Sequence, residues 1–291
     1  MTRAVAPSSL AEAVRLLAED PGLVPIAGCT DLMVREPEAL ADLPGVLDLL
    51  GLPELRGIRE VDGALEIGAA TTFAELRAAP LVRRLFPALA DAASQVGGWQ
   101  IQNRATIGGN VVNASPAGDS LPVLLALEAR VVLAGAGGER MVPYDAFHTG
   151  YRETALGPGE LVRALVLPLP APGSRQLFRK VGTRAAQAIS KVVVAMAARV
   201  DRGAIGSLRL AAGSVAPVPV RLRAVEEAVT GRRPDSATAD LAGRLAAESV
   251  EPIDDVRSTA AYRRFALANV VRRMVLGLGE DAETPVDEAE W

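Results

Sequence analysis

The stretch TIGGNVVNASPAGD, residues 106–119, interrupts an otherwise aliphatic sequence with small and hydrogen-bonding residues. Two adjacent glycines, Gly108 and Gly109, let a backbone take conformations that are closed to residues with a Cβ, and let it approach a ligand closely. Successive N–H groups in such a turn can converge on an anion, and Thr106 and Asn110 add side-chain donors beside it. The stretch therefore predicts a loop that binds phosphate.

A second loop of this kind is expected earlier in the chain, in the sequence PIAGCTDL of residues 25–32. Leu23–Ile26 is a short apolar run that is typical of a strand, and the turn at Gly28 ends it. The N–H groups that follow this strand, with the Thr30 hydroxyl, are suited to one phosphate while the later loop binds the other. The two loops together predict a pyrophosphate site, and the alternative for the earlier loop is an ordinary tight turn that needs a glycine.

With residues 96–104, these two loops resemble the FAD-binding medium subunit of molybdenum hydroxylases, the xanthine dehydrogenase and carbon monoxide dehydrogenase type. The resemblance spans nearly the whole chain, and paired motifs are far more specific than a lone glycine pair. It implies an α+β fold, in which a two-part FAD-binding domain of the PCMH and vanillyl-alcohol-oxidase-like type precedes a smaller C-terminal domain with a three-stranded sheet and helices. It also implies non-covalent FAD, with [2Fe–2S] clusters and molybdopterin held only by partner subunits.

The resemblance also implies which residues contact the cofactor. In the first loop they are Ala27, Gly28, Cys29, Thr30, Asp31 and Leu32, and relatives usually have a second glycine where Cys29 stands. In the second loop they are Thr106, Gly108, Gly109 and Asn110 at the pyrophosphate, with Asn113, Ser115 and Asp119 on the adenosine and flavin side. Val162 matches an aliphatic wall position, and Lys180 matches a lysine near the flavin ring, where a cation would stabilise the reduced, anionic form.

Three of these residues have an equally simple structural interpretation. Asp119 is suited to capping the N-terminus of a helix ahead of Pro122. Lys180 is typical of an exposed lysine at a strand edge, and Val162 of a core residue.

Two further features stand outside the loops. Trp99 and Gln100 lie where relatives approach the cofactor or a neighbouring subunit, and a tryptophan in a glycine-flanked loop favours an interface. His148 is the sole histidine, and with no second histidine or partner cysteine it predicts a structural role and no metal site.

Composition narrows the classes of function. A net charge of −4 with dispersed arginines disfavours nucleic acid as a partner. The N-terminal sequence lacks a signal-peptide pattern and no apolar run is long enough for a membrane span, so a cytoplasmic protein is expected. Because Cys29 is the only cysteine, an iron–sulfur cluster cannot be built from this chain alone.

The resemblance implies an oxidoreductase subunit that transfers electrons. A small [2Fe–2S] subunit would pass electrons from a large molybdopterin subunit to this FAD, which would reduce NAD⁺, a quinone or oxygen, in a dimer of heterotrimers. No catalytic side chain is expected, because the cofactor carries the redox chemistry. Two alternatives stay open. One is a self-sufficient flavin reductase or oxidase of related fold. The other is a non-catalytic scaffold that has lost FAD, for which the replacement of the family's usual glycine by Cys29 would be the reason.

The apolar pattern and its breakers predict the elements of the first part. Capping boxes predict helices after Ser9 and Thr72, and further helices are expected over Leu81–Ala93 and Leu121–Ala129, with an irregular segment from Gly97 to the glycine pair. Strands are predicted at Leu23–Ile26, Val46–Leu49, Ile58–Val61, Ala64–Ile67, Val131–Ala134 and Glu160–Pro168.

The proline-dense residues 168–174 predict the domain boundary. We expect a FAD-binding domain at 1–173, with subdomains of about 1–55 and 56–173, a C-terminal domain at 174–280 and an acidic tail at 281–291. The C-terminal domain is predicted to have helices on one side of a sheet. The strands are Leu177–Val181, Lys191–Val200 and Ser207–Val215, and the helices are Arg221–Val229, Ala237–Ala247 and Ala260–Leu276.

Overall fold

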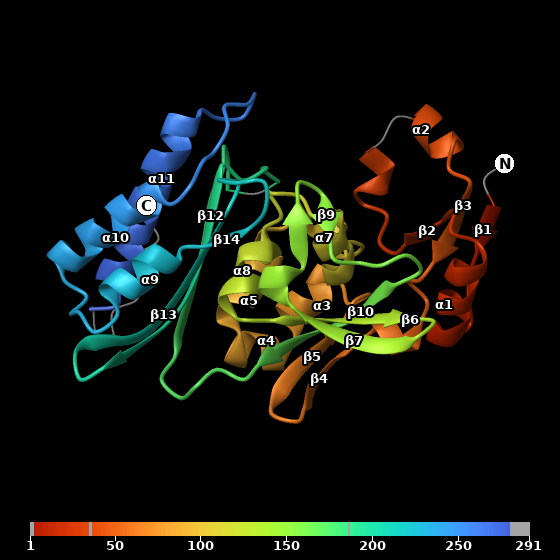
Figure 1. The fold of residues 1–291 in the computed structure, drawn as a ribbon, viewed down its shortest axis with the longest axis horizontal. Helices are drawn as coiled ribbons and strands as arrows, with labels where there is room; N and C mark the ends of the chain where they lie inside the picture. Colours follow the sequence, from red (N-terminus) through yellow and green to blue (C-terminus); the bar gives the residue numbers. More distant parts are fainter. Residues whose placement is uncertain (1–2, 35–36, 186, 280–291) are drawn as a thin grey trace.

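The computed structural model describes residues 3–34, 37–185 and 187–279, and it builds them around three main sheets (Figure 1). The chain runs from an N-terminal lobe, through a central sheet with its helices, to a C-terminal sheet and helices at the opposite end. The fold is therefore α+β. The predicted acidic tail at 281–291 lies outside the described residues.

The N-terminal lobe is a small parallel sheet with one long helix. Strands β1 (Arg3–Val5), β3 (Gly45–Asp48) and β2 (Leu23–Ile26) pair in that order. Ser9 is the N-cap of helix α1 (Leu10–Glu19), which buries Ala13, Val14 and Leu17, and its side chain accepts from the Glu12 N–H. The Glu12 carboxylate accepts from Ser8 and not from Ser9, so the predicted capping box forms only in part. The short η1 (Leu32–Val34) and α2 (Pro37–Ala41) lie between β2 and β3.

The central sheet is antiparallel, in the order β4-β5-β10-β6-β7. Its strands are β4 (Ile58–Val61), β5 (Ala64–Gly68), β10 (Leu161–Pro168), β6 (Arg130–Gly135) and β7 (Gly138–Pro143). The Asp62-Gly63 hairpin forms as predicted, with both residues at positive φ. The short η2 (Pro53–Leu55) precedes this sheet, and η3 (Tyr144–Ala146), β8 (His148–Gly150) and β9 (Glu153–Thr154) lie between β7 and β10.

Short helices connect β5 to β6. They are α3 (Phe73–Ala78), α4 (Pro80–Leu85), α5 (Pro87–Gln95), α6 (Trp99–Gln102), α7 (Ile107–Asn113) and α8 (Ser120–Ala126). Two of them, α5 and α8, pack against the C-terminal sheet. The single helix predicted over Leu81–Ala93 is wrong, because the chain leaves the helical conformation at Phe86, the residue before Pro87. The segment predicted to be irregular contains α6, and the glycine pair lies inside α7.

The C-terminal sheet has four strands, one more than predicted. Its order is β11 (Arg175–Val181), β12 (Val192–Asp201), β13 (Ala204–Gly213) and β14 (Val220–Arg221). The helix predicted over Arg221–Val229 begins two residues later, as α9 (Arg223–Val229), because Arg221 is part of β14.

Helices cover both faces of the C-terminal sheet, where one covered face was predicted. Alternate residues of β12 such as Val192 and Val194 pack with α9, α10 (Ser236–Glu248) and α11 (Ala260–Leu276). The residues between them, such as Val193 and Ala195, join the core of α5 and α8. A strand buried on both faces is apolar throughout, as β12 is.

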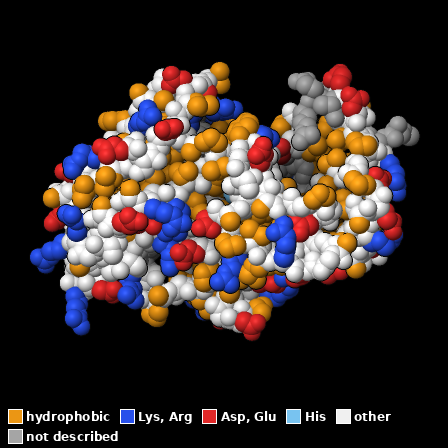
Figure 2. Space-filling view, in the orientation of Figure 1, with side chains coloured by type: hydrophobic (Ala, Val, Ile, Leu, Met, Phe, Trp, Pro, Cys, Tyr) orange, Lys and Arg blue, Asp and Glu red, His pale blue; other side chains and the backbone are white. Residues whose placement is uncertain are grey.

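No described helix has the length and the apolar composition that crossing a bilayer requires. On the face shown in Figure 2, acidic and basic side chains are interspersed across the whole surface.

Candidate functional site

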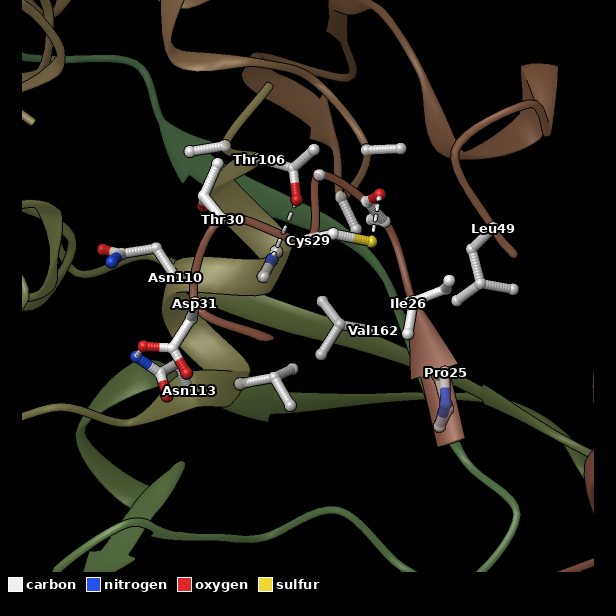
Figure 3. Close-up of a pocket in the computed structure, with 18 of the residues that line it drawn as sticks. Pro25, Ile26, Cys29, Thr30, Asp31, Leu49, Thr106, Asn110, Asn113 and Val162 are labelled. Atoms are coloured by element: carbon white, nitrogen blue, oxygen red, sulfur yellow. Dashed lines mark hydrogen bonds between the residues drawn. The ribbon is translucent and has the colours of Figure 1, made fainter. Parts of the chain in front are cut away.

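A cavity of about 710 Å³ lies where the N-terminal lobe meets the central sheet, and both predicted loops line it (Figure 3). This volume is in the range of small-molecule and cofactor pockets. The predicted site residues in its lining are Ala27, Gly28, Cys29, Thr30, Asp31, Leu32, Thr106, Gly108, Gly109, Asn110, Asn113 and Val162. Aliphatic side chains that include Ile26, Leu49 and Leu156 complete the wall. The structure thus brings together two segments that are far apart in the sequence.

The first loop offers free backbone donors. The amide N–H groups of Gly28, Cys29, Thr30 and Asp31 donate no hydrogen bond to any residue that the structure describes. Cys29 takes a left-handed conformation with φ 60°. Alternating right- and left-handed residues turn successive N–H groups toward a common point, which is how backbone binds anions. Among the described residues, this loop therefore has unpaired backbone donors of the kind that a phosphate-binding loop needs.

The left-handed conformation of Cys29 is one that a glycine would adopt more readily. A side chain in the left-handed region costs about 1–2 kcal/mol, which a glycine avoids. The Cys29 thiol donates to the Ala27 carbonyl at 3.4 Å, across the turn. Burial raises the pKa of this thiol, so it is protonated at neutral pH. The cysteine is thus compatible with the turn, at the cost of local strain.

The second loop is not the backbone turn that the glycine pair predicted. Thr106 caps α7, and its Oγ1 accepts from the Gly109 N–H at 3.1 Å. The other N–H groups of this turn are also used within the chain: Ile107 donates to Thr71 O, Gly108 to Ala69 O and Asn110 to Thr106 O. The donors that remain are side chains, namely the Thr106 hydroxyl and the Asn110 amide, whose Oδ1 accepts from Ser120 at 2.7 Å. Backbone donors therefore come from one loop and side-chain donors from the other.

The glycines themselves differ in what they do. A Cβ on Gly28 would lie 1.9 Å from Arg104 O, and one on Gly108 would lie 2.6 Å from Ala69 Cβ. These two glycines let the loops pack against their neighbours. A Cβ on Gly109 would meet only Thr106 Oγ1, at 2.9 Å, so Gly109 leaves bare backbone at the cavity wall.

Ser115, Asp119 and Lys180 do not line this cavity. Asp119 Oδ2 and Lys180 Nζ lie 2.6 Å apart with both side chains buried, and Lys180 also donates to Gln95 O at 3.0 Å. Burial raises the pKa of Asp119 to about 6, while Lys180 opposes the shift. Ser115 Oγ accepts from the Ala117 N–H at 3.3 Å.

Asp119 and Lys180 differ from their simple structural interpretations, which were a helix-capping side chain and an exposed lysine. Asp119 occupies the N-cap position of α8, but its side chain makes no capping hydrogen bond. Lys180 is buried rather than exposed, because strand alternation places it on the same face of β11 as Phe178, toward α5 and α8. The pair joins the first turn of α8 to the C-terminal sheet.

Sequence reasoning missed Arg152, which also lines the cavity. Its Nη1 donates to Asn113 Oδ1 at 3.2 Å, and Asn113 Nδ2 donates to Asp31 Oδ1 at 3.1 Å. Figure 3 shows Asp31 and Asn113 facing one another beside the cavity. No motif marks Arg152, since it lies in a short turn whose position depends on the fold.

Trp99, Gln100 and His148, the other residues noted in the sequence, do not line the cavity. Trp99 is 69% exposed and lies under the Arg77 guanidinium at 4.2 Å, and Gln100 is also exposed. His148 is half-buried, its Nε2 lies 3.1 Å from the Tyr144 hydroxyl, and its ring packs edge-on against Tyr144 and Phe147. Burial lowers the pKa of His148 to about 4, so the ring is neutral at pH 7.

Comparison with known families accounts for both parts of the chain. Residues 1–170 match the FAD binding domain in molybdopterin dehydrogenase, and residues 177–278 match the CO dehydrogenase flavoprotein C-terminal domain.

Individual relatives match over nearly their full lengths. The xanthine dehydrogenase FAD-binding subunit of Escherichia coli O157:H7 is 33% identical over 284 residues, which cover 92% of each chain. The nicotinate dehydrogenase FAD-subunit of Eubacterium barkeri is 29% identical over 291 residues, or 97% of this chain and 98% of that one. Among solved structures, carbon monoxide dehydrogenase from Hydrogenophaga pseudoflava superimposes with a TM-score of 0.90 at 31% identity, over 94% of this chain and 95% of that one. The chain belongs to the family of FAD-binding medium subunits of molybdenum hydroxylases, the xanthine dehydrogenase and carbon monoxide dehydrogenase type, and is an oxidoreductase subunit.

Proposed function

We propose that this chain is the electron-transfer subunit of a molybdopterin-dependent hydroxylase or dehydrogenase, and that its FAD binds without a covalent bond in the cavity between the two loops. The observation that carries the proposal is a set of four consecutive N–H groups, at residues 28–31, that have no hydrogen-bond partner among the described residues, in a cavity that Thr106 and Asn110 also line. Backbone and side-chain donors around one space suit a diphosphate. FAD supplies the redox chemistry when it is bound.

The residues of this chain bind and orient the cofactor. The amides of the first loop, with Thr106 and Asn110, would hold the diphosphate. The bare backbone at Gly109 allows close approach, and Val162 with the other aliphatic residues excludes water. The predicted cofactor contacts of Ser115, Asp119 and Lys180 stay a prediction, since these residues lie beyond the lining.

We further propose the electron route and the partners. A small [2Fe–2S] subunit would deliver electrons from a large molybdopterin subunit, in a dimer of heterotrimers, and the acceptor would be NAD⁺, a quinone or oxygen. Two observations support separate partner chains: relatives are named medium chains or subunits of larger enzymes, and this chain has one cysteine, too few for a cluster. The names of the relatives refer to different substrates, such as nicotinate and carbon monoxide. We therefore propose that the substrate binds to the large partner subunit and not to this chain.

We also propose that the chain divides into a FAD-binding domain at 1–173 and a C-terminal domain at 174–280, and that the protein is cytoplasmic. The family matches that end at residue 170 and begin at residue 177 support the division.

Purification of the tagged chain from its native cells, under gentle conditions, tests the assembly. We expect a large and a small subunit in equal amounts with this chain, together with molybdenum, iron and FAD. Addition of the oxidisable substrate under anaerobic conditions should then bleach the flavin absorbance. An isolated chain that reduces or oxidises a substrate by itself would contradict the proposal and favour a self-sufficient flavoenzyme.

A further inference from the structure

Arg152 brings a positive charge to the wall of the cavity. It lies in the turn between β8 and β9, with φ 56°, a conformation that a side chain seldom adopts. Its Nη1 donates to Asn113 Oδ1, and Asn113 Nδ2 donates to Asp31 Oδ1. These bonds connect the first loop, the C-terminal residue of α7 and the β8–β9 turn around one end of the cavity.

The charges of the lining make Arg152 distinctive. Of the described residues that line the cavity, Arg152 carries the one positive side chain, against the carboxylates of Asp31 and Glu160. Glu160 is already compensated, because Arg140 contacts it at 2.6 Å. Without Arg152, the described lining would hold the Asp31 carboxylate and no positive side chain, so it would repel an anion.

Asn113 keeps the guanidinium and the carboxylate from pairing directly. It accepts from Arg152 through Oδ1 and donates to Asp31 through Nδ2, so it stands between the two charges. An arginine bonded to a neutral amide keeps more of its charge available than one bonded to a carboxylate, and a guanidinium matches phosphate geometry well. The arrangement therefore leaves a cation ready for an incoming anionic group.

We propose that Arg152 is a further ligand-binding residue, which supplies the positive charge for the diphosphate of the dinucleotide in this cavity, and that Asn113 positions it. This inference rests on the proposed FAD site. It assigns a role to the β8–β9 turn, which no sequence motif marks.

The test compares FAD binding by the apo form of the full chain in three variants. Arg152→Gln keeps a donor for Asn113 but removes the charge, and Arg152→Lys keeps the charge. The control is Arg199→Gln, which makes the same change in net charge at an exposed arginine that pairs with Asp201 in the C-terminal sheet. We expect Arg152→Gln to raise the FAD dissociation constant about 10-fold, Arg152→Lys to raise it less, and Arg199→Gln to leave it unchanged. The penalty of Arg152→Gln should shrink as salt is raised.

Two further readouts separate charge at the diphosphate from other roles. The apo Arg152→Gln chain should unfold at the same temperature as the control, and the midpoint potential of its bound flavin should equal that of the wild type. A lowered potential with an unchanged dissociation constant would place the cation at the flavin ring and overturn the inference. Equal FAD affinity in Arg152→Gln and Arg199→Gln would also overturn it, whereas a wild-type chain that binds no FAD would instead refute the proposed function.

Discussion

Lys180 Nζ lies 2.6 Å from Asp119 Oδ2, and this ion pair connects β11 of the C-terminal sheet to the start of α8. The side chains are 7% and 9% exposed, so both charges have left water. Removing one member of a buried pair leaves an uncompensated charge, which is far more costly than the pair itself is stabilising.

Lys180→Met should therefore lower the free energy of unfolding by about 3 kcal/mol at pH 8. The cost should be smaller at pH 5. Burial already raises the pKa of Asp119 to about 6 against the opposing effect of Lys180, so loss of the lysine raises this pKa further. A carboxyl group whose pKa is raised in the folded state contributes stability at low pH that is lost as the pH rises through that pKa.

Urea unfolding of the apo chain at both pH values measures this effect, with Arg199→Met as the matched control at an exposed pair. The control should cost less than about 1 kcal/mol. A cost for Lys180→Met that is equally small, or that does not change with pH, would show that the pair contributes little.

Cys29→Gly should bind FAD at least as tightly as the wild type and should stabilise the fold by about 1 kcal/mol. A glycine takes the φ of 60° without strain, and the loop's phosphate donors are backbone N–H groups that the substitution retains. Cys29→Val, with a β-branched side chain in the same conformation, should weaken FAD binding. Flavin titration and thermal unfolding of the two variants measure both effects. Loss of FAD binding in Cys29→Gly would show that the thiol itself contacts the cofactor.

His148 should make the fold sensitive to mild acid. Burial lowers its pKa to about 4, from 6.5, so the unfolded chain takes up the proton first as the pH falls. The stability that the neutral ring contributes is present above pH 6.5 and is lost on the way down to pH 4, by up to about 2 kcal/mol at pH 5.

The measurement is the difference in unfolding free energy between wild type and His148→Gln at pH 7.5 and at pH 5. Glutamine keeps a polar partner for the Tyr144 hydroxyl but does not titrate. The wild type should lose more stability than the variant over this interval, and parallel losses would contradict the assigned pKa.

The two loops and most of the elements could be predicted from the sequence because their signals are local. The Ser9 cap, the Thr72–Glu75 capping box, the Asp62-Gly63 hairpin and the apolar runs all act through neighbours in the chain. The Phe86–Pro87 break was also local, and the continuous apolar pattern over Leu81–Ala93 concealed it.

What could not be predicted depends on contacts between distant segments. The Gly108 N–H donates to Ala69 O and the neighbouring Ile107 N–H donates to Thr71 O, both of which the fold brings to α7. Lys180 is buried because α5 and α8 cover the second face of the C-terminal sheet. Arg152 reaches the cavity only through the β8–β9 turn.

Gly109→Val gives the most direct test of the cavity between the two loops as the FAD site. A Cβ there would lie 2.9 Å from Thr106 Oγ1 and would have no other neighbour within 4 Å outside its own helix, so a small shift of that hydroxyl should let the chain fold, but the side chain would fill the space beside the predicted diphosphate. Gly51→Val is the matched control, because a Cβ on Gly51 has no neighbour within 4 Å.

The measurement is the amount of FAD released by acid from each purified chain, identified by chromatography and divided by protein concentration, with circular dichroism as the check on folding. We expect close to one FAD per chain for the wild type and for Gly51→Val, and almost none for a folded Gly109→Val. A folded Gly109→Val chain with its full complement of FAD would contradict the assignment of this cavity.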